Sequence, residues 1–299
     1  MKEQFLDKTF SPRALEMVNV ANRIIESYAA QGYGMTVRQL HYRFVAENIY
    51  KNTDQNYKSL ASLVSEARMA GIVDWDNIKD LTRTTKQLDT HEGITQYLQT
   101  LNEHYRLQKW KNQKHYVEVM VEKQALENIL HPLCEKWEVA FTANRGYSSS
   151  SSLYERGKYL QSMRDVEGKR VHVLYFGDLD PSGYAMSGDV KARLELFSDG
   201  PVDVQRMALN IEQVRQYDLV ENPVKVDDSR AAAYIELFGT SSWELDALTP
   251  PVLVDLVEGG IKRYINMPQW EADVRKEQDE KDKLQDIIEA LKAATPGAS

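Results

Sequence analysis

Two carboxylates follow one of the most apolar runs in the chain. Residues 173–176 read Val-Leu-Tyr-Phe, Gly177 to Asp180 follow, and Pro181-Ser182-Gly183 then turn the chain away. This pattern predicts a buried strand with Asp178 and Asp180 at its carboxyl end. Side chains two positions apart on a strand share a face, so the carboxylates would repel each other without a cation or proton between them. Oxygen ligands of this kind suit Mg²⁺, and the alternative interpretation is a solvated turn.

A third carboxylate, Glu122, comes directly after an expected strand at 115–121. Further strands are expected at 139–142, 170–176 and 202–208, with helices at 123–135 and 153–164 between them. Strands that alternate with helices predict an α/β fold with a mostly parallel sheet, in which ligands bind beyond the carboxyl ends of the strands. Glu122, Asp178 and Asp180 are therefore the candidate metal ligands, for Mg²⁺ or alternatively Mn²⁺. A structural network of ion pairs is the other interpretation.

The N-terminal part has helical periodicity over residues 11–30, 36–48 and 57–70. Three short helices at this spacing resemble a helix-turn-helix, and residues 72–78 could add the strand or wing of a winged helix. Basic side chains in such helices, and in the Gly/Ser-rich loop beside the predicted metal site, are candidate phosphate contacts. The candidate DNA-binding residues are Arg43, Lys58, Arg68 and Arg145.

Composition and charge limit the class of protein. The net charge of −8 argues against a surface coated with basic charge. Residues 1–110 hold 14 Lys and Arg against 13 Asp and Glu, whereas residues 111–299 hold 23 against 32, which fits a DNA-reading module joined to a metal-dependent one. Cys134 is the only cysteine, which excludes an internal disulfide. The sequence has no apparent membrane span or signal peptide, so we expect a cytoplasmic protein.

A charged junction at residues 109–114 follows a longer helix expected over 89–110. We therefore predict three parts: a helical DNA-binding domain at 1–110, an α/β metal-binding domain at 111–269, and a charged C-terminal helix and tail at 270–299.

The order of the motifs resembles one protein family. Residues 121–126 (Val-Glu-Lys-Gln-Ala-Leu), the loop at 144–148 and residues 177–183 occur in the order typical of a Toprim domain, the metal-binding fold of topoisomerases, primases and some nucleases. The Asp-x-Asp-Pro-x-Gly form is similar to the A subunit of topoisomerase VI and the related meiotic double-strand-break transesterase. Residues 36–42 (Thr-Val-Arg-Gln-Leu-His-Tyr) resemble the tyrosine motif of that family, and residues 243–248 resemble its Glu-x-x-Ala-Leu segment.

This resemblance, closest to small stand-alone A-type proteins, implies a winged-helix domain followed by a Toprim domain, and cleavage of double-stranded DNA. Tyr42 would attack a backbone phosphate and stay covalently bound to the DNA end. Arg38, one helical turn before it, would hold the phosphate or stabilise the phenolate. The resemblance also implies a nucleoid-associated homodimer in which Tyr42 of one protomer serves the metal site of the other. Strand passage would need a separate ATPase subunit of the B type.

Two other functions fit the same residues. A Toprim nuclease would keep the metal and use water in place of Tyr42, whose side chain would then be a buried aromatic of the helical core. A non-catalytic winged-helix DNA-binding or replication protein would keep the folds without the chemistry.

Overall fold

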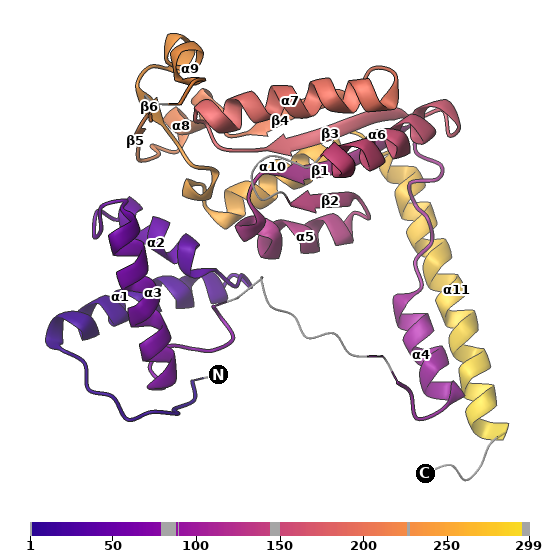
Figure 1. Ribbon diagram of the computed structural model, residues 1–299. Coiled ribbons are helices and arrows are strands. Elements are labelled where there is room, and N and C mark those ends of the chain that lie inside the picture. Colours follow the sequence, from indigo (N-terminus) through magenta and orange to yellow (C-terminus); the bar gives the residue numbers. More distant parts are fainter. Residues whose placement is uncertain (1, 79–87, 89, 144–149, 226–227, 295–299) are drawn as a thin grey trace.

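The computed structural model describes residues 2–78, 88, 90–143, 150–225 and 228–294 (Figure 1). It consists of a three-helix part at the N-terminus, a sheet part with helices on both faces, and a long helix pair that projects from the sheet part (Figure 1). The helices of the first part are α1 (Pro12–Ala29), α2 (Val37–Ala46) and α3 (Asp54–Met69).

Each helix of the N-terminal part begins at a capping side chain. The hydroxyls of Ser11, Thr36 and Thr53 accept hydrogen bonds from backbone N–H groups in the first turns of α1, α2 and α3. Thr36 also forms a capping box with Gln39. Because Thr53 is the cap, α3 begins at Asp54, earlier than the apolar periodicity predicted. The helices enclose a core of buried side chains: Val18, Ala21, Ile25, Leu40, Phe44, Leu60, Val64 and Ala67.

The predicted wing strand at 72–78 does not form. The segment is a series of turns and bends. Ile78 forms an isolated β-bridge with Met35. Val73 and Ile78 are nevertheless buried against the three helices. The apolar residues of this segment therefore fill the helical core, which explains why the pattern resembled a strand.

The sheet has four parallel strands in the order β2-β1-β3-β4. They are β1 (His115–Val121), β2 (Ala140–Ala143), β3 (Arg170–Phe176) and β4 (Asp203–Ala208). Around and after them lie the 3₁₀ helices η1 (Gln124–Leu126) and η2 (Leu245–Ala247), the short antiparallel strands β5 (Asn222–Pro223) and β6 (Ser241–Ser242), and the helices α5 (Glu127–Lys136), α6 (Ser150–Asp165), α7 (Pro181–Ser198), α8 (Ile211–Gln216), α9 (Ala231–Phe238) and α10 (Pro250–Lys262). The predicted α/β class with a parallel sheet is confirmed.

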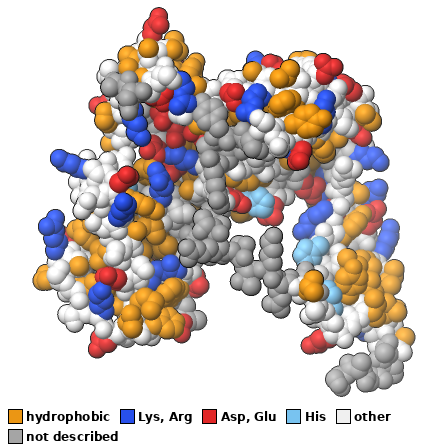
Figure 2. Space-filling model, viewed as in Figure 1, with side chains coloured by type: hydrophobic (Ala, Val, Ile, Leu, Met, Phe, Trp, Pro, Cys, Tyr) orange, Lys and Arg blue, Asp and Glu red, His pale blue; other side chains and the backbone are white. Residues whose placement is uncertain are grey.

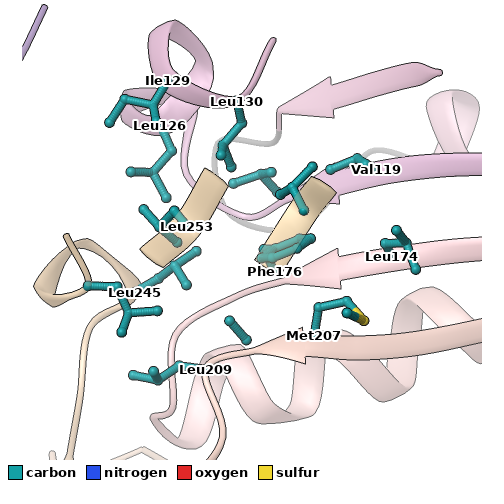
Figure 3. Close-up of a cluster of buried hydrophobic side chains, with 14 of the residues drawn as sticks. Val119, Leu126, Ile129, Leu130, Leu174, Phe176, Met207, Leu209, Leu245 and Leu253 are labelled. Carbon is teal, nitrogen blue, oxygen red and sulfur yellow. The ribbon is translucent and has the colours of Figure 1, made fainter. Parts of the chain in front are cut away.

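Alternating strand residues form two cores. Val119, Leu174 and Phe176 lie on the face covered by α5 and α10, where Leu130 and Leu253 pack among them (Figure 3). Met120, Val173 and Tyr175 lie on the opposite face, against α6 and α7. Both faces of the sheet are thus buried, as expected for parallel strands joined by helices.

The helix expected over 89–110 is shorter in the structure, where α4 runs from Ile94 to His104. It packs against α11 (Met267–Ala294). Trp110 is buried in the core of the sheet part, beside Trp137 and Trp270. Residues 94–110 therefore pack with the sheet part and α11. Among the described residues, no helix is both long and apolar enough to cross a membrane.

A glycine sets the contact between α6 and α7. A Cβ atom added to Gly157 would lie 2.5 Å from the Cβ of Phe197 and 3.1 Å from its carbonyl carbon. We expect Gly157→Ala to lower the free energy of unfolding by about 1–3 kcal/mol, since the two helices must separate. In Gly259→Ala on α10, the added methyl group meets nothing within 4 Å. This control should raise stability by up to about 1 kcal/mol, and urea unfolding of both variants tests the contrast.

Candidate active site

The loop after β3 carries the two aspartates, but they do not share a strand face as predicted. β3 ends at Phe176, and Asp180 is the N-cap of α7, where its Oδ1 accepts a hydrogen bond of 2.6 Å from the N–H of Gly183. Pro181 occupies the first turn of that helix. The segment after Asp180 therefore starts a helix, whereas Asp178 stays in the buried loop, 7% exposed.

Arg206, on the neighbouring strand β4, holds this loop in place. Its guanidinium donates hydrogen bonds to the carbonyl oxygens of Gly177, Asp178, Gly183 and Leu209. The sequence did not single out Arg206, because it lies within an ordinary strand pattern.

Glu122 lies directly against this loop. Its Oε2 accepts a hydrogen bond of 3.0 Å from the N–H of Asp178. A Cβ atom built on Gly177 or Gly183 would lie 2.6 Å or 2.9 Å from the same oxygen. The two glycines thus leave the room that the Glu122 carboxylate occupies, and the structure brings Glu122 and Asp178 together as predicted.

Burial and nearby carboxylates raise the pKa values of both carboxyls. Burial and then the charge of Asp178 raise the pKa of Glu122 to about 8. Burial raises the pKa of Asp178 to about 6, although the ammonium of Lys123 opposes this shift. The pair therefore gains from a nearby cation at neutral pH.

Lys123 supplies one such cation. Its Nζ lies 3.0 Å from Asp178 Oδ1, 3.6 Å from Asp246 Oδ1, and in hydrogen-bond contact with Glu244 Oε2. The N–H of Leu245 donates a 2.7 Å hydrogen bond to Asp178 Oδ1, which ties η2 to the aspartate loop. The side chain of Leu245 is anchored in the core near Leu209 and Leu253 (Figure 3).

Glu244 and Asp246 were missed as site residues, although their segment carried part of the family resemblance. The available signal was the pair of acidic residues around Leu245, which is Glu244-Leu245-Asp246, within that segment. Lys123 was missed because a lysine after a strand is usually solvated.

Tyr42 and Arg38 of α2 join this network within the same chain. The Tyr42 hydroxyl donates a hydrogen bond to Glu244 Oε2 and accepts hydrogen bonds of 3.2 Å and 3.1 Å from Nε and Nη2 of Arg38. The Lys123 Nζ lies 5.4 Å from the centre of the Tyr42 ring. The helix α2 also contacts η2 directly. The structure thus connects the predicted tyrosine to Asp178 through Glu244 and Lys123.

The Tyr42 hydroxyl is held in its protonated form. Burial raises its pKa, the charge of Lys123 lowers it, and the charge of Glu244 raises it, with a large net increase. The pKa of Glu244 is lower than usual: burial raises it, but the ammonium of Lys123 and the hydrogen bonds from Lys123 and Tyr42 outweigh burial. A neutral phenol therefore donates to an ionised carboxylate.

Two cavities open onto Tyr42 and Glu244. One has a volume of about 310 Å³ and is also lined by Arg43. The other has a volume of about 510 Å³ and is also lined by Arg38 and Asp180. The second cavity therefore places Tyr42, Arg38 and the start of α7 around one space, large enough for a part of a substrate.

The candidate DNA-binding residues have different surroundings. Lys58 on α3 is exposed, and Arg43 lies beside the smaller cavity. Arg68 donates a 2.8 Å hydrogen bond to the carbonyl of Trp75 and lies 4.4 Å from the centre of its ring, so it braces the segment after α3. Arg145 lies outside the described residues. On the face shown in Figure 2, basic side chains of the three-helix part are scattered over it.

The oxygen donors of Glu122 and Asp178 have the chemistry of ligands for a hard cation, although their grouping falls short of a metal site. Among the described residues, no three His, Cys, Asp or Glu side chains are grouped so that they could hold an ion. Glu122 and Asp178 are nevertheless buried oxygen donors with raised pKa values, and Asp180 begins the helix that follows them. Such a donor set suits Mg²⁺, provided that Asp180 turns from its capping bond toward the pair.

Comparison of the sequence with models of known protein families finds no match, and a comparison with curated proteins finds none either. The fold and the geometry of the site therefore carry the functional inference.

Proposed function

We propose that the chain cleaves double-stranded DNA by transesterification, with Tyr42 as the nucleophile and Arg38 as the residue that holds the attacked phosphate. On this proposal, α1 to α3 are a winged-helix-like DNA-binding module and the sheet part is a Toprim domain. The function is that of a topoisomerase A-type protein, acting as a nucleoid-associated homodimer. A separate ATPase subunit would be required for strand passage.

One observation supports this proposal most: Tyr42, from the helical part, is in hydrogen-bond contact with a carboxylate of the sheet part, 202 positions away in sequence. A tyrosine that served only the helical core would have no reason to face an acidic edge. Its guanidinium neighbour, Arg38, is at hydrogen-bond distance and lines the same cavity. Tyr42, Arg38, Asp180 and Glu244 therefore line one space. This supports phosphoryl transfer, which requires a nucleophile and charged groups around one phosphate.

Glu122, Asp178 and Asp180 are the residues that would hold Mg²⁺, or Mn²⁺ in its place. The bound ion would stabilise negative charge on the attacked phosphate and on the leaving 3′-oxygen. The acidic edge would otherwise repel the DNA backbone, so we expect a divalent cation to be needed for productive binding as well.

The direct test is a detergent trap. Purified protein is incubated with supercoiled plasmid and Mg²⁺ or Mn²⁺, quenched with detergent, and analysed with and without protease. We expect nicked or linear DNA that carries protein, and no such product in EDTA. Asp178→Ala should lower its yield by at least about 10²-fold, because a buried ligand of the site is lost.

The other outcomes identify the alternative functions. Free DNA ends without protein would indicate a nuclease that uses water. Absence of breakage with every metal, together with DNA binding that is insensitive to chelators, would indicate a binding protein without catalysis.

A further inference from the structure

The Tyr42 hydroxyl has one described hydrogen-bond acceptor, Glu244 Oε2. The Arg38 guanidinium only donates hydrogen bonds, and so does the Lys123 ammonium. The neighbouring ring of His41 packs edge-on against Tyr57, with ring centres 5.8 Å apart. The phenol proton therefore points at a carboxylate that nothing in the family resemblance assigns to the reaction.

Glu244 is well prepared to accept that proton. Its side chain is 28% exposed, and its Oε2 also accepts a hydrogen bond from Lys123. Lys123 is in turn held by Asp178 and Asp246. This lysine keeps Glu244 ionised and fixes its position, so that the carboxylate is present as a base and does not need to reorganise.

We propose that Glu244 is the general base of the reaction and accepts the Tyr42 proton within the same chain; this inference rests on the proposed function. As the phenolic oxygen bonds to phosphorus, its hydrogen passes to Glu244 Oε2, and the bond between phosphorus and the leaving 3′-oxygen breaks. The leaving oxygen takes a proton from solvent water. Arg38 remains at the phenolic oxygen and the phosphate throughout, and Lys123 acts as a positioning residue for Glu244.

The choice of Glu244 explains two features of the site. A phenol that is this strongly protonated at rest needs a base in contact with it. Glu244 has a low pKa and takes the proton effectively only when the Tyr42 hydroxyl becomes more acidic. This happens as the bond between the phenolic oxygen and phosphorus forms. Tyr42 therefore stays protonated and unreactive until DNA is bound.

The test measures formation of protein-linked DNA by rapid quench, from pH 6 to pH 10, in wild type and Glu244→Gln. Glutamine keeps the size of the side chain and its hydrogen bond but accepts no proton. We expect a rate loss of about 10²-fold or more at pH 7. The rate of the variant should then climb steeply with pH, because hydroxide replaces the missing base. A purely positioning role would instead lower the rate by the same factor at every pH, and this outcome would overturn the proposal.

Two controls separate this result from other causes. Glu236→Gln changes an exposed glutamate on α9 and should behave like wild type. A DNA substrate with sulfur in place of the leaving 3′-oxygen should restore the linkage rate of Asp178→Ala, because sulfur leaves readily without stabilisation of its negative charge. The same substrate should leave the linkage rate of Glu244→Gln low. Rescue of Glu244→Gln by sulfur would contradict a role at the nucleophile.

Failure of the proposed function has a different signature. If wild type never links to DNA under any metal, both the function and this inference fall. If wild type links to DNA and Glu244→Gln links at an equal rate, only the inference falls. Urea unfolding of each variant shows whether it is folded.

Discussion

Tyr42→Phe should abolish protein-linked DNA, with a loss of more than about 10³-fold in the rate, because the variant has no nucleophilic oxygen. The ring itself is 7% exposed and keeps its packing. The loss of its hydrogen bonds to Glu244 and Arg38 should change the free energy of unfolding by only about 1–2 kcal/mol. DNA binding should survive. The measurements are covalent linkage in the detergent trap, binding by fluorescence anisotropy, and urea unfolding.

Tyr57→Phe is the matched control, because this tyrosine lies on α3 with its ring 5.9 Å from the Arg38 guanidinium. It should link to DNA at the wild-type rate. If Tyr42→Phe still breaks DNA and leaves free ends, water is the nucleophile and the chain is a nuclease.

Mixtures of Tyr42→Phe with Asp178→Ala then show which chain supplies the tyrosine. The family resemblance implies that it comes from the partner protomer, and a mixed dimer would then contain one complete site. In the structure Tyr42 contacts Glu244 of its own chain, so we expect the mixture to stay inactive. Recovery of nicking in the mixture would show that the partner donates the tyrosine.

The apolar pattern of the sequence predicted the strands and helices well where burial alone decides the local structure. β1 and β3 begin and end as predicted, because short segments rich in valine, aromatic and other apolar residues with both faces buried have few alternatives. Asp180 shows the limit of such signals. The sequence Asp-Pro-Ser-Gly fits a turn and also fits an N-cap followed by proline in the first turn of a helix. The apolar residues of α7, which cover the sheet, decide between these two structures.

The site was predictable only in part, for a related reason. Glu122 and Asp178 could be brought together in advance, because the carboxyl ends of neighbouring parallel strands meet at one edge. The contact of Tyr42 with Glu244 could not, since it depends on how α2 packs against η2. The partners of Lys123 could not be predicted either, since Asp178, Glu244 and Asp246 come together at its ammonium only through the tertiary fold.

Glu122→Gln should make the protein more stable at pH 8.5 while removing its response to metal. The pKa of Glu122 is about 8 in the folded protein, well above its value in an unfolded chain. A folded state with a raised carboxyl pKa binds its proton more tightly than the unfolded state. Its stability is therefore greatest at low pH and falls as the pH rises from about 4 to about 8. Above that pH range, removal of the ionisable group should raise the free energy of unfolding by a few kcal/mol.

Urea unfolding at pH 5.5 and pH 8.5, with and without Mg²⁺, tests this expectation. Wild type should be less stable at pH 8.5, and Mg²⁺ should restore stability there, because a cation offsets the repulsion between Glu122 and Asp178. Glu122→Gln should show a weaker pH dependence and little response to Mg²⁺. Glu155→Gln, on the exposed side of α6, should match wild type. If Mg²⁺ stabilises Glu122→Gln as much as wild type, Glu122 is no ligand, and its burial needs another explanation.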